Sequence, residues 1–233
     1  AIGRRRRGER ASKPVGVMML YDSTPAAVFS LRKTGIKSPA DLHGKKLGAP
    51  VFDAGRRAFP IFAKANGIDT AKVAWSAMDP PLRETMLARG DVDAITGFYF
   101  TSLLNLNARG VKDEDIDVMM YPKYGANIYG NAIIVSDTFM KAKPEAVRGF
   151  LRAMTKGIRD VLADPDGSIR FVKERDALIG ARSARRGGPR PVVNELRALV
   201  AESRVVLVRL DDEKRAGSQS RRQRLRRGWN LLE

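Results

Sequence analysis

The sequence has 233 residues, with 43 lysines and arginines against 26 acidic residues, no cysteine and one histidine, giving a formal charge of +17. Without cysteine the chain cannot form disulfides, use a thiol nucleophile or bind zinc through sulfur. A single histidine excludes multi-histidine metal sites and argues against Ser-His-Asp chemistry. No apolar run approaches the roughly 20 residues that cross a bilayer. The chain begins with Ala1 and shows no apolar signal segment, so we expect a fragment or a processed form.

Strands and helices alternate along the middle of the chain. Apolar runs predict strands, in chain order, over residues 14–20, 27–31, 46–50, 73–75, 92–95, 115–121 and 131–135. Capping residues, prolines and apolar periodicity predict helices that begin at Ser38, Asp53, Asp79, Phe100 and Pro144. This alternation is typical of an α/β fold, and we expect its sheet to be mainly parallel.

Most of the positive charge lies at the two ends. Residues 1–13 hold six basic and one acidic side chains, and residues 181–233 hold fourteen and six, so the ends carry 13 of the 17 net charges. Three interpretations stay open: disordered polar tails, a nucleic-acid or anionic-membrane patch, or translation out of frame, to which the Arg-rich run 180–191 points. Trp229 is the only aromatic residue of either end, which argues against nucleic acid as a partner.

Three loops are candidates for a binding site. In open α/β sheets a ligand lies beyond the carboxyl ends of strands and beside helix N-termini, and residues 21–25, 51–57 and 78–81 meet this condition. In the second loop the helix amides and Arg56 suit an anionic or polar group, and an ordinary capped helix is the alternative. We find no nucleophile–base pair, carboxylate dyad or metal-ligand cluster, and therefore expect no metal and no cofactor.

Aromatic residues gather after two of the predicted strands. They are Phe98, Tyr99 and Phe100 after the first, and Tyr121, Tyr124 and Tyr129 before Asn131. Tyrosine rings stack on planar ligands while their hydroxyl groups bind polar edges, although the core is expected to take part of this set. His43 lies in a polar turn and is expected at the surface.

Several stretches together resemble one family. They are GIKSPADLHGKKLG (35–48), DAGR (53–56) with AKANG (63–67), ARGDVDAI (88–95) and YGANIYGNA (124–132). This set is similar to the periplasmic solute-binding proteins of ABC importers, in the branch for thiamine-pyrimidine precursors beside the nitrate, sulfonate and taurine binders. The resemblance spans residues 14–180.

The resemblance implies a two-lobe periplasmic-binding-protein fold of type II that closes on its ligand by a hinge motion. Residues 45–120 would form the inserted lobe, and residues 14–31 and 124–180 the remainder of the first lobe. Opening βα units of the first lobe have no counterpart here, so we expect that lobe to be incomplete at its N-terminal side and ligand binding to be weak or absent. The family further implies a periplasmic monomer that works with an ABC permease in the membrane.

The resemblance also selects site residues. Asp53, Ala54, Gly55 and Arg56 match the ligand-side loop of the family. Further candidates for the cleft are Tyr21, Asp22, Tyr99, Tyr129 and Asn131. Asp22 would accept a hydrogen bond from a pyrimidine amino group, and a tyrosine would stack on the ring.

Two other functions are weighed against solute binding. A pyrimidine synthase of the same fold sacrifices its own histidine and holds pyridoxal phosphate on a lysine, and residues 4–10 here contain neither residue. Its cysteine-rich iron site is also impossible without cysteine, so binding is favoured over catalysis. Nucleic-acid binding through the basic tails is the third hypothesis.

Overall fold

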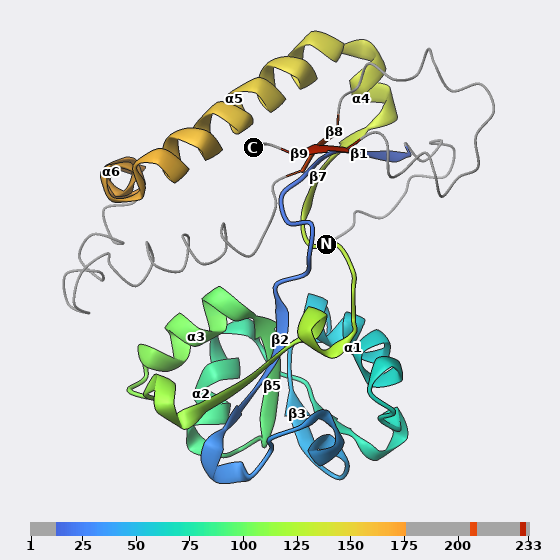
Figure 1. The fold of residues 1–233 in the computed structure, drawn as a ribbon, viewed down its shortest axis with the longest axis vertical. Helices are drawn as coiled ribbons and strands as arrows, with labels where there is room; N and C mark the ends of the chain where they lie inside the picture. The colour runs from blue at the N-terminus through green and yellow to red at the C-terminus, as the bar shows by residue number, and fades with distance from the viewer. Residues whose placement is uncertain (1–12, 176–205, 209–228, 232–233) are drawn as a thin grey trace.

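The computed structural model describes residues 13–175, 206–208 and 229–231 (Figure 1). The two basic ends assigned from the sequence, 1–13 and 181–233, lie outside the described residues except for Lys13 and two short strands. The described part forms two units that are joined by two chain segments (Figure 1).

The larger unit is built on a five-stranded sheet in the order β4-β3-β5-β2-β6. Its strands are β2 (Ala26–Leu31), β3 (Lys46–Gly48), β4 (Ala74–Ser76), β5 (Ala94–Phe98) and β6 (Ile116–Met120). β3 pairs in parallel with β4 and β5, whereas β2 pairs antiparallel with β5 and β6. The expectation of an α/β fold is confirmed. Four of the five strands run in the same direction, as expected for a mainly parallel sheet, and β2 alone runs in the opposite direction.

Helices cover both faces of this sheet. They are α1 (Ala54–Ala65), α2 (Arg83–Arg89) and α3 (Tyr99–Asn107), with 3₁₀ turns η1 (Arg32–Thr34), η2 (Pro39–Leu42), η3 (Thr70–Lys72), η4 (Pro80–Leu82), η5 (Asp113–Asp115) and η6 (Tyr121–Tyr124). Strand β2 is buried throughout, and its residues alternate between the two apolar clusters. Val28 packs with the α1 residues Phe59 and Phe62, whereas Phe29 packs with Leu87 of α2 and Leu106 of α3.

Local capping explains where the helices begin and end. The Asp53 carboxylate accepts a hydrogen bond from the Arg56 amide and caps α1, as the sequence predicts. The Asp41 carboxylate accepts from the Ser38 amide and hydroxyl group at the start of η2. These bonds hold the pKa of Asp41 below its usual value. Gly90 ends α2 in the left-handed conformation, at a φ of 85°.

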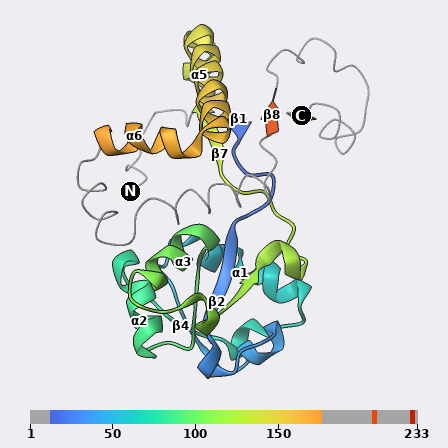
Figure 2. The ribbon, with the colours of Figure 1, turned by 60° about the vertical axis from the view of Figure 1, so that its left-hand side comes forward.

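The described residues of the smaller unit form a four-stranded antiparallel sheet and three helices. Strand β1 (Pro14–Met19) pairs with β7 (Ala132–Ser136), and the sheet continues to β8 (Val206–Val208) and β9 (Trp229–Leu231). The helices α4 (Asp137–Ala142), α5 (Pro144–Ala163) and α6 (Pro165–Arg175) follow β7 (Figure 2). Apolar residues of this unit are exposed, among them Ile134, Phe139, Phe150 and Phe171. No described helix has the length and apolar character that a membrane span needs.

Two boundaries differ from those drawn from the sequence. Residues 14–31 are assigned above to one lobe, but β2 is an interior strand of the five-stranded sheet, so the chain crosses between the units after β1. The strand predicted at 92–95 begins at Ala94 instead, because Asp93 is engaged in a turn. Its carboxylate accepts a hydrogen bond from the Lys46 amide at 2.8 Å.

Candidate functional site

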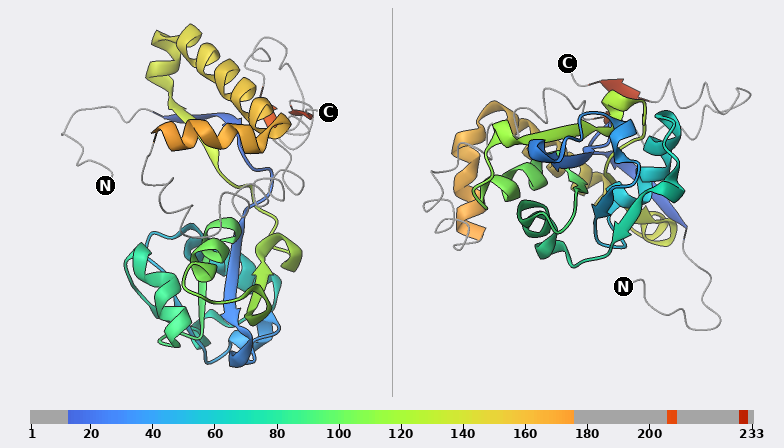
Figure 3. Two further views of the ribbon diagram at one scale, coloured as in Figure 1. Left: turned by 90° about the vertical axis from the view of Figure 1, so that its left-hand side faces the viewer. Right: turned by 90° about the horizontal axis from the view of Figure 1, so that it is seen from below.

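The ends of the five strands bring the candidate loops to one edge of the larger sheet. β3, β4 and β5 are parallel, so their carboxyl ends lie together. β2 begins at the same edge, since Ala26 lies opposite Phe98, and β6 ends there, since Met120 lies opposite Ala27. The three loops selected from the sequence, 21–25, 51–57 and 78–81, are therefore neighbours at this edge, which faces the smaller unit (Figure 3).

Two chain segments cross between the units at this edge and are hydrogen-bonded to each other. Residues 20–25 lead from β1 to β2, and residues 125–131 lead from η6 to β7 (Figure 3). The Leu20 amide donates to the Asn131 carbonyl at 2.8 Å, and the Thr24 amide donates to the Ile128 carbonyl at the same distance. The Gly130 amide donates to the Tyr21 carbonyl at 3.0 Å. A pair of crossing segments is the arrangement through which two lobes can hinge.

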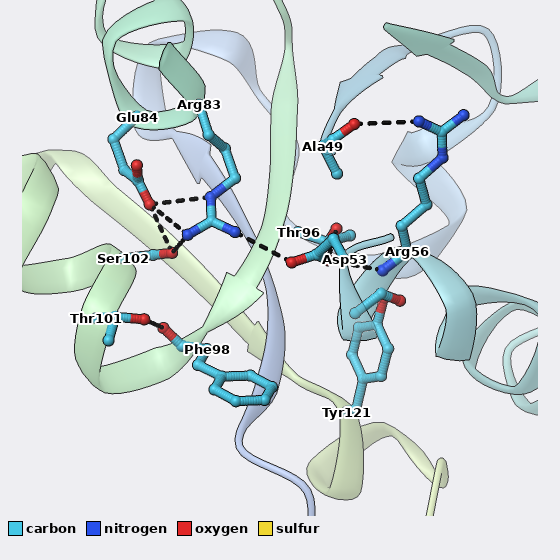
Figure 4. Close-up of polar contacts among 11 residues, drawn as sticks. Ala49, Asp53, Arg56, Arg83, Glu84, Thr96, Phe98, Thr101, Ser102 and Tyr121 are labelled. Atoms are coloured by element: carbon cyan, nitrogen blue, oxygen red, sulfur yellow. Dashed lines mark hydrogen bonds and ion pairs between the residues drawn. The ribbon is translucent and has the colours of Figure 1, made fainter. Parts of the chain in front are cut away.

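The largely buried carboxylate of Asp53 lies at the N-terminus of α1. Asp53 Oδ1 accepts hydrogen bonds from the Arg56 amide at 2.9 Å and from the Thr96 hydroxyl at 2.8 Å (Figure 4). Gly55 lets the helix approach β5 closely, because a Cβ atom there would lie 3.0 Å from both Asp53 Oδ1 and the Cβ of Thr96. The sequence thus places a glycine where helix and strand touch.

A buried ion cluster supports this carboxylate from the opposite side. Arg83 Nη1 donates to Asp53 Oδ2 at 3.1 Å, and Arg83 Nη2 donates to Glu84 Oε1 at 2.8 Å (Figure 4). Ser102 on α3 donates to Glu84 Oε1 at 2.9 Å. Glu84 is 1% exposed, so water cannot solvate its carboxylate and these donors replace the lost hydrogen bonds. The cluster connects α2 and α3 to the capping residue of α1.

Arg56 points away from the helix terminus that it follows. Its guanidinium donates to the Ala49 carbonyl at 3.1 Å (Figure 4). The same guanidinium lies 4.8 Å from the centre of the Trp75 ring. The Arg56 guanidinium therefore contacts residues of the larger unit itself.

Tyr121 begins η6, directly before the second crossing segment, and connects η6 to α1. Its hydroxyl donates to the Gly55 carbonyl at 2.9 Å, at the start of α1 (Figure 4). Its ring stacks on Phe62 with a centroid distance of 4.6 Å. Burial, with a smaller contribution from the charge of Asp53, raises the pKa of Tyr121 well above its usual value. Tyr121 therefore remains a protonated donor and belongs to the core.

Apolar and aromatic side chains surround the edge. Val51 and Phe52 are each 65% exposed in the loop before α1, and Tyr129 is 59% exposed in the crossing segment. Tyr21 is half-buried and lies 6.1 Å, ring centre to ring centre, from Phe100. Burial raises the pKa of Tyr21.

The sequence-derived site residues fall into two groups. Asp53, Ala54, Gly55 and Arg56 lie at the N-terminus of α1. Tyr21, Asp22, Tyr129 and Asn131 lie on the two crossing segments, and Tyr99 begins α3, where its amide donates to the Pro25 carbonyl. The strand ends bring both groups to the same edge.

Sequence reasoning missed Arg83, Glu84, Thr96 and Ser102. A signal was present, because Glu84 precedes the buried Leu87 by three residues and Ser102 precedes the buried Leu106 by four. Polar residues on the inward face of a helix need partners. Within the described part of the chain, no group of three or more His, Cys, Asp or Glu side chains could hold a metal ion.

The sheet, the covering helices and the crossing segments form the two-lobe fold that is known from periplasmic binding proteins. Solved structures with this fold include the aliphatic sulphonate binding protein SsuA from Escherichia coli, with a TM-score of 0.56 and 17% identity over 80% of this chain and 56% of that one. The alkanesulfonate-binding protein SsuA from Xanthomonas axonopodis pv. citri gives a TM-score of 0.54 and 17% identity, covering 79% and 58%. At this identity the likeness shows the fold alone.

The chain belongs to the NMT1/THI5 like family, whose sequence model matches residues 7–168. It is also 30% identical over 176 residues to the riboflavin-binding protein RibY of Chloroflexus aurantiacus. That match covers 73% of this chain and 48% of RibY, so the chain spans about half the length of this curated relative.

Proposed function

We propose that this protein is the solute-binding component of an ABC importer and binds a thiamine-pyrimidine precursor or a related small planar or anionic solute. The observation that carries the proposal is the pair of crossing, hydrogen-bonded segments beside the sheet edge, because that pair provides a hinge where the candidate loops meet. In this proposal residues 45–120, together with β2, form the inserted lobe, and residues 14–19 and 124–180 belong to the first lobe. The protein works as a periplasmic monomer with a membrane permease.

The residues proposed to contact the solute are those at the edge. Tyr129 is exposed there and provides a ring for stacking, while the half-buried Asp22 accepts from a ring amino group. Tyr21, Tyr99 and Asn131 line the crossing segments and the start of α3, beside the helix terminus formed by residues 53–56. RibY is named for a solute with a planar ring system, which supports a planar ligand and favours binding over catalysis.

Titration tests the proposal directly. The purified 233-residue chain is titrated to millimolar concentration with riboflavin, with an aminomethylpyrimidine and with ethanesulfonate, and binding is followed by calorimetry and by NMR. We expect saturable binding of at least one of the three solutes. Saturation by none of them would overturn the proposal.

A pair of variants tests the placement of the site. Tyr129→Ala removes an exposed ring at the edge, whereas Phe139→Ala removes a ring of similar exposure, 49%, from α4 in the smaller unit. We expect the dissociation constant to rise at least tenfold in Tyr129→Ala, because stacking is lost, and to stay within twofold in Phe139→Ala. Equal effects of the two changes would place the site elsewhere.

A further inference from the structure

The chain is attached to α1 just before it enters the second crossing segment. η6 precedes that segment, and its Tyr121 and Tyr124 rings both pack on Phe62 of α1, with ring centres 4.6 Å and 6.0 Å away. The Tyr121 hydroxyl donates to the Gly55 carbonyl near the N-terminal end of the helix. At the C-terminal end of the helix, Asn66 makes a second polar contact with η6.

The Asn66 side chain joins the last carbonyls of α1 and η6. Its Nδ2 atom donates to the Phe62 carbonyl at 2.7 Å and to the Tyr124 carbonyl at 2.8 Å. The backbone N–H of Asn66 donates to the Ala63 carbonyl and not to the Phe62 carbonyl, which is its α-helical partner, so the side chain supplies a donor for Phe62. A side-chain amide nitrogen carries two hydrogens, and these two bonds use both of them.

Gly125 and Ala126 continue the attachment beyond η6. Ala126 is 0% exposed and belongs to the apolar cluster that contains Phe62. A Cβ atom at Gly125 would lie 3.4 Å from the Cβ of Ala65, so the backbone there touches α1. Within residues 127–131, by contrast, every second residue is exposed. The second crossing segment is therefore fixed to α1 as far as Ala126.

The first crossing segment becomes fixed at a matching level. Thr24 is 6% exposed, and its hydroxyl oxygen accepts a hydrogen bond from the Ala26 amide at 3.2 Å. Its own amide donates to the Ile128 carbonyl at 2.8 Å, two residues beyond Ala126. The border between the larger unit and the hinge therefore runs through Thr24 and Ala126.

This attachment sets the distance between two groups of proposed solute contacts. Residues 53–56 lie at the N-terminus of α1, whereas Tyr129 and Asn131 follow η6. Because polar contacts hold η6 near both ends of α1, the segment that carries Tyr129 starts from a fixed point relative to residues 53–56. Without the Asn66 contact, the C-terminal end of η6 loses its hydrogen bond to α1.

We propose that Asn66 is a positioning residue for solute binding, whose side-chain amide holds η6 against α1 and so sets where the second crossing segment begins to bend. This inference rests on the proposed function, because it names the residue that keeps the two groups of solute contacts at a fixed distance. Asn66 lies at the end of α1 opposite to residues 53–56 and acts through η6.

The variant Asn66→Asp tests this role. It removes both donors at nearly constant size and places a carboxylate before two carbonyl oxygens. Deuterium exchange is followed by NMR in the solute-free chain, at the amides of Thr24, Ala126 and Ile128, whose hydrogen bonds lie at the border of the hinge. We expect these amides to exchange at least tenfold faster, because local opening of the border no longer has to break the Asn66 contact.

Asn107→Asp is the matched control. Asn107 ends α3, and its Nδ2 atom donates to the Val111 carbonyl at 3.0 Å and to the Asp113 carboxylate at 2.7 Å, so both partners belong to the loop before β6. We expect the border amides to exchange within twofold of their rate in the unmodified chain. Equal rates at these amides in the two variants would overturn the inference. Asn66→Ala removes the donors without adding a charge and takes the place of Asn66→Asp if that variant does not fold.

Solute binding separates this inference from the proposed function. Riboflavin, an aminomethylpyrimidine and ethanesulfonate are titrated into the unmodified chain and into both variants. For any solute that binds, we expect the dissociation constant to rise at least fivefold in Asn66→Asp and to stay within twofold in Asn107→Asp. If a solute binds all three chains equally, solute binding stands and the positioning role of Asn66 is wrong. If none binds the unmodified chain, the proposed function fails, and the exchange rates alone decide whether Asn66 holds η6.

Discussion

Arg83 is the residue on which the polar interior of the larger unit depends. Its guanidinium is the cation for both Asp53 and Glu84, and it also donates to Ser102 at 3.2 Å. Its side chain is 12% exposed, so water compensates little if a partner is removed. Breaking a buried ion pair from one side leaves an uncompensated charge.

Replacement of Arg83 by methionine tests this dependence. We expect Arg83→Met to lower the free energy of unfolding by about 3–5 kcal/mol, because Glu84 and Asp53 lose their common cation. Urea denaturation followed by circular dichroism measures the change. Arg32→Met is the control, since Arg32 is 60% exposed and its contact with Asp117 is 3.7 Å long. A pair of that kind contributes about 0–1 kcal/mol. Equal losses in the two variants would show that the buried cluster is not held by Arg83.

At the scale of elements, the sequence predicts the ends of helices correctly, because these depend on neighbouring residues. Asp53 caps α1 and Gly90 ends α2, as expected, because capping needs only residues within one turn. The order of the strands could not be predicted from the sequence, because β2 is apolar except for Ser30 and fits an edge position, an interior position or the other lobe equally well. Its place between β5 and β6 depends on pairing with strands more than 60 residues away.

Of the residues at the candidate site, the sequence likewise predicts those that local patterns mark and misses those that only packing brings together. The residues at the start of α1 and on the crossing segments were found because they follow strands or match a family motif. Glu84 and Ser102 were missed, because an Arg-Glu pair beside two prolines has the composition of a solvated surface. Only the packing of α2 against α3 buries that pair. Long-range burial is the information that a single sequence lacks.

The hydroxyl group of Tyr121 connects η6 to α1 through a single hydrogen bond to the Gly55 carbonyl. Removing it in Tyr121→Phe leaves the buried Gly55 carbonyl without this donor, so we expect a loss of about 1–2 kcal/mol in the free energy of unfolding. Urea denaturation measures it. Tyr124→Phe is the control, because the Tyr124 ring also contacts Phe62 but its hydroxyl makes no hydrogen bond within the described part of the chain. A loss as small as that of the control would mean that the Gly55 carbonyl finds another partner.

At the scale of the whole molecule, the two units meet through two chain segments. The bonds between residues 20–24 and 128–131 hold these segments side by side. Their contact is close at Gly130, where a Cβ atom would lie 2.6 Å from the Cβ of Tyr21 and 3.1 Å from the Ser23 carbonyl oxygen. A side chain there must separate the segments, because Tyr21 Cβ and a backbone oxygen cannot move aside as a flexible chain end can.

Gly130→Ala therefore tests whether the crossing pair acts as a single hinge. We expect the amides of Leu20, Thr24 and Gly130 or its replacement to exchange with deuterium at least tenfold faster, since their bonds lengthen when the segments separate. Gly16→Ala is the matched control: Gly16 lies in β1, and a Cβ atom there would meet nothing within 4 Å. Exchange is measured by NMR at several temperatures. If it stays unchanged at these amides while the five-stranded unit remains folded, the crossing segments adapt independently, and closure of the lobes does not depend on their mutual contact.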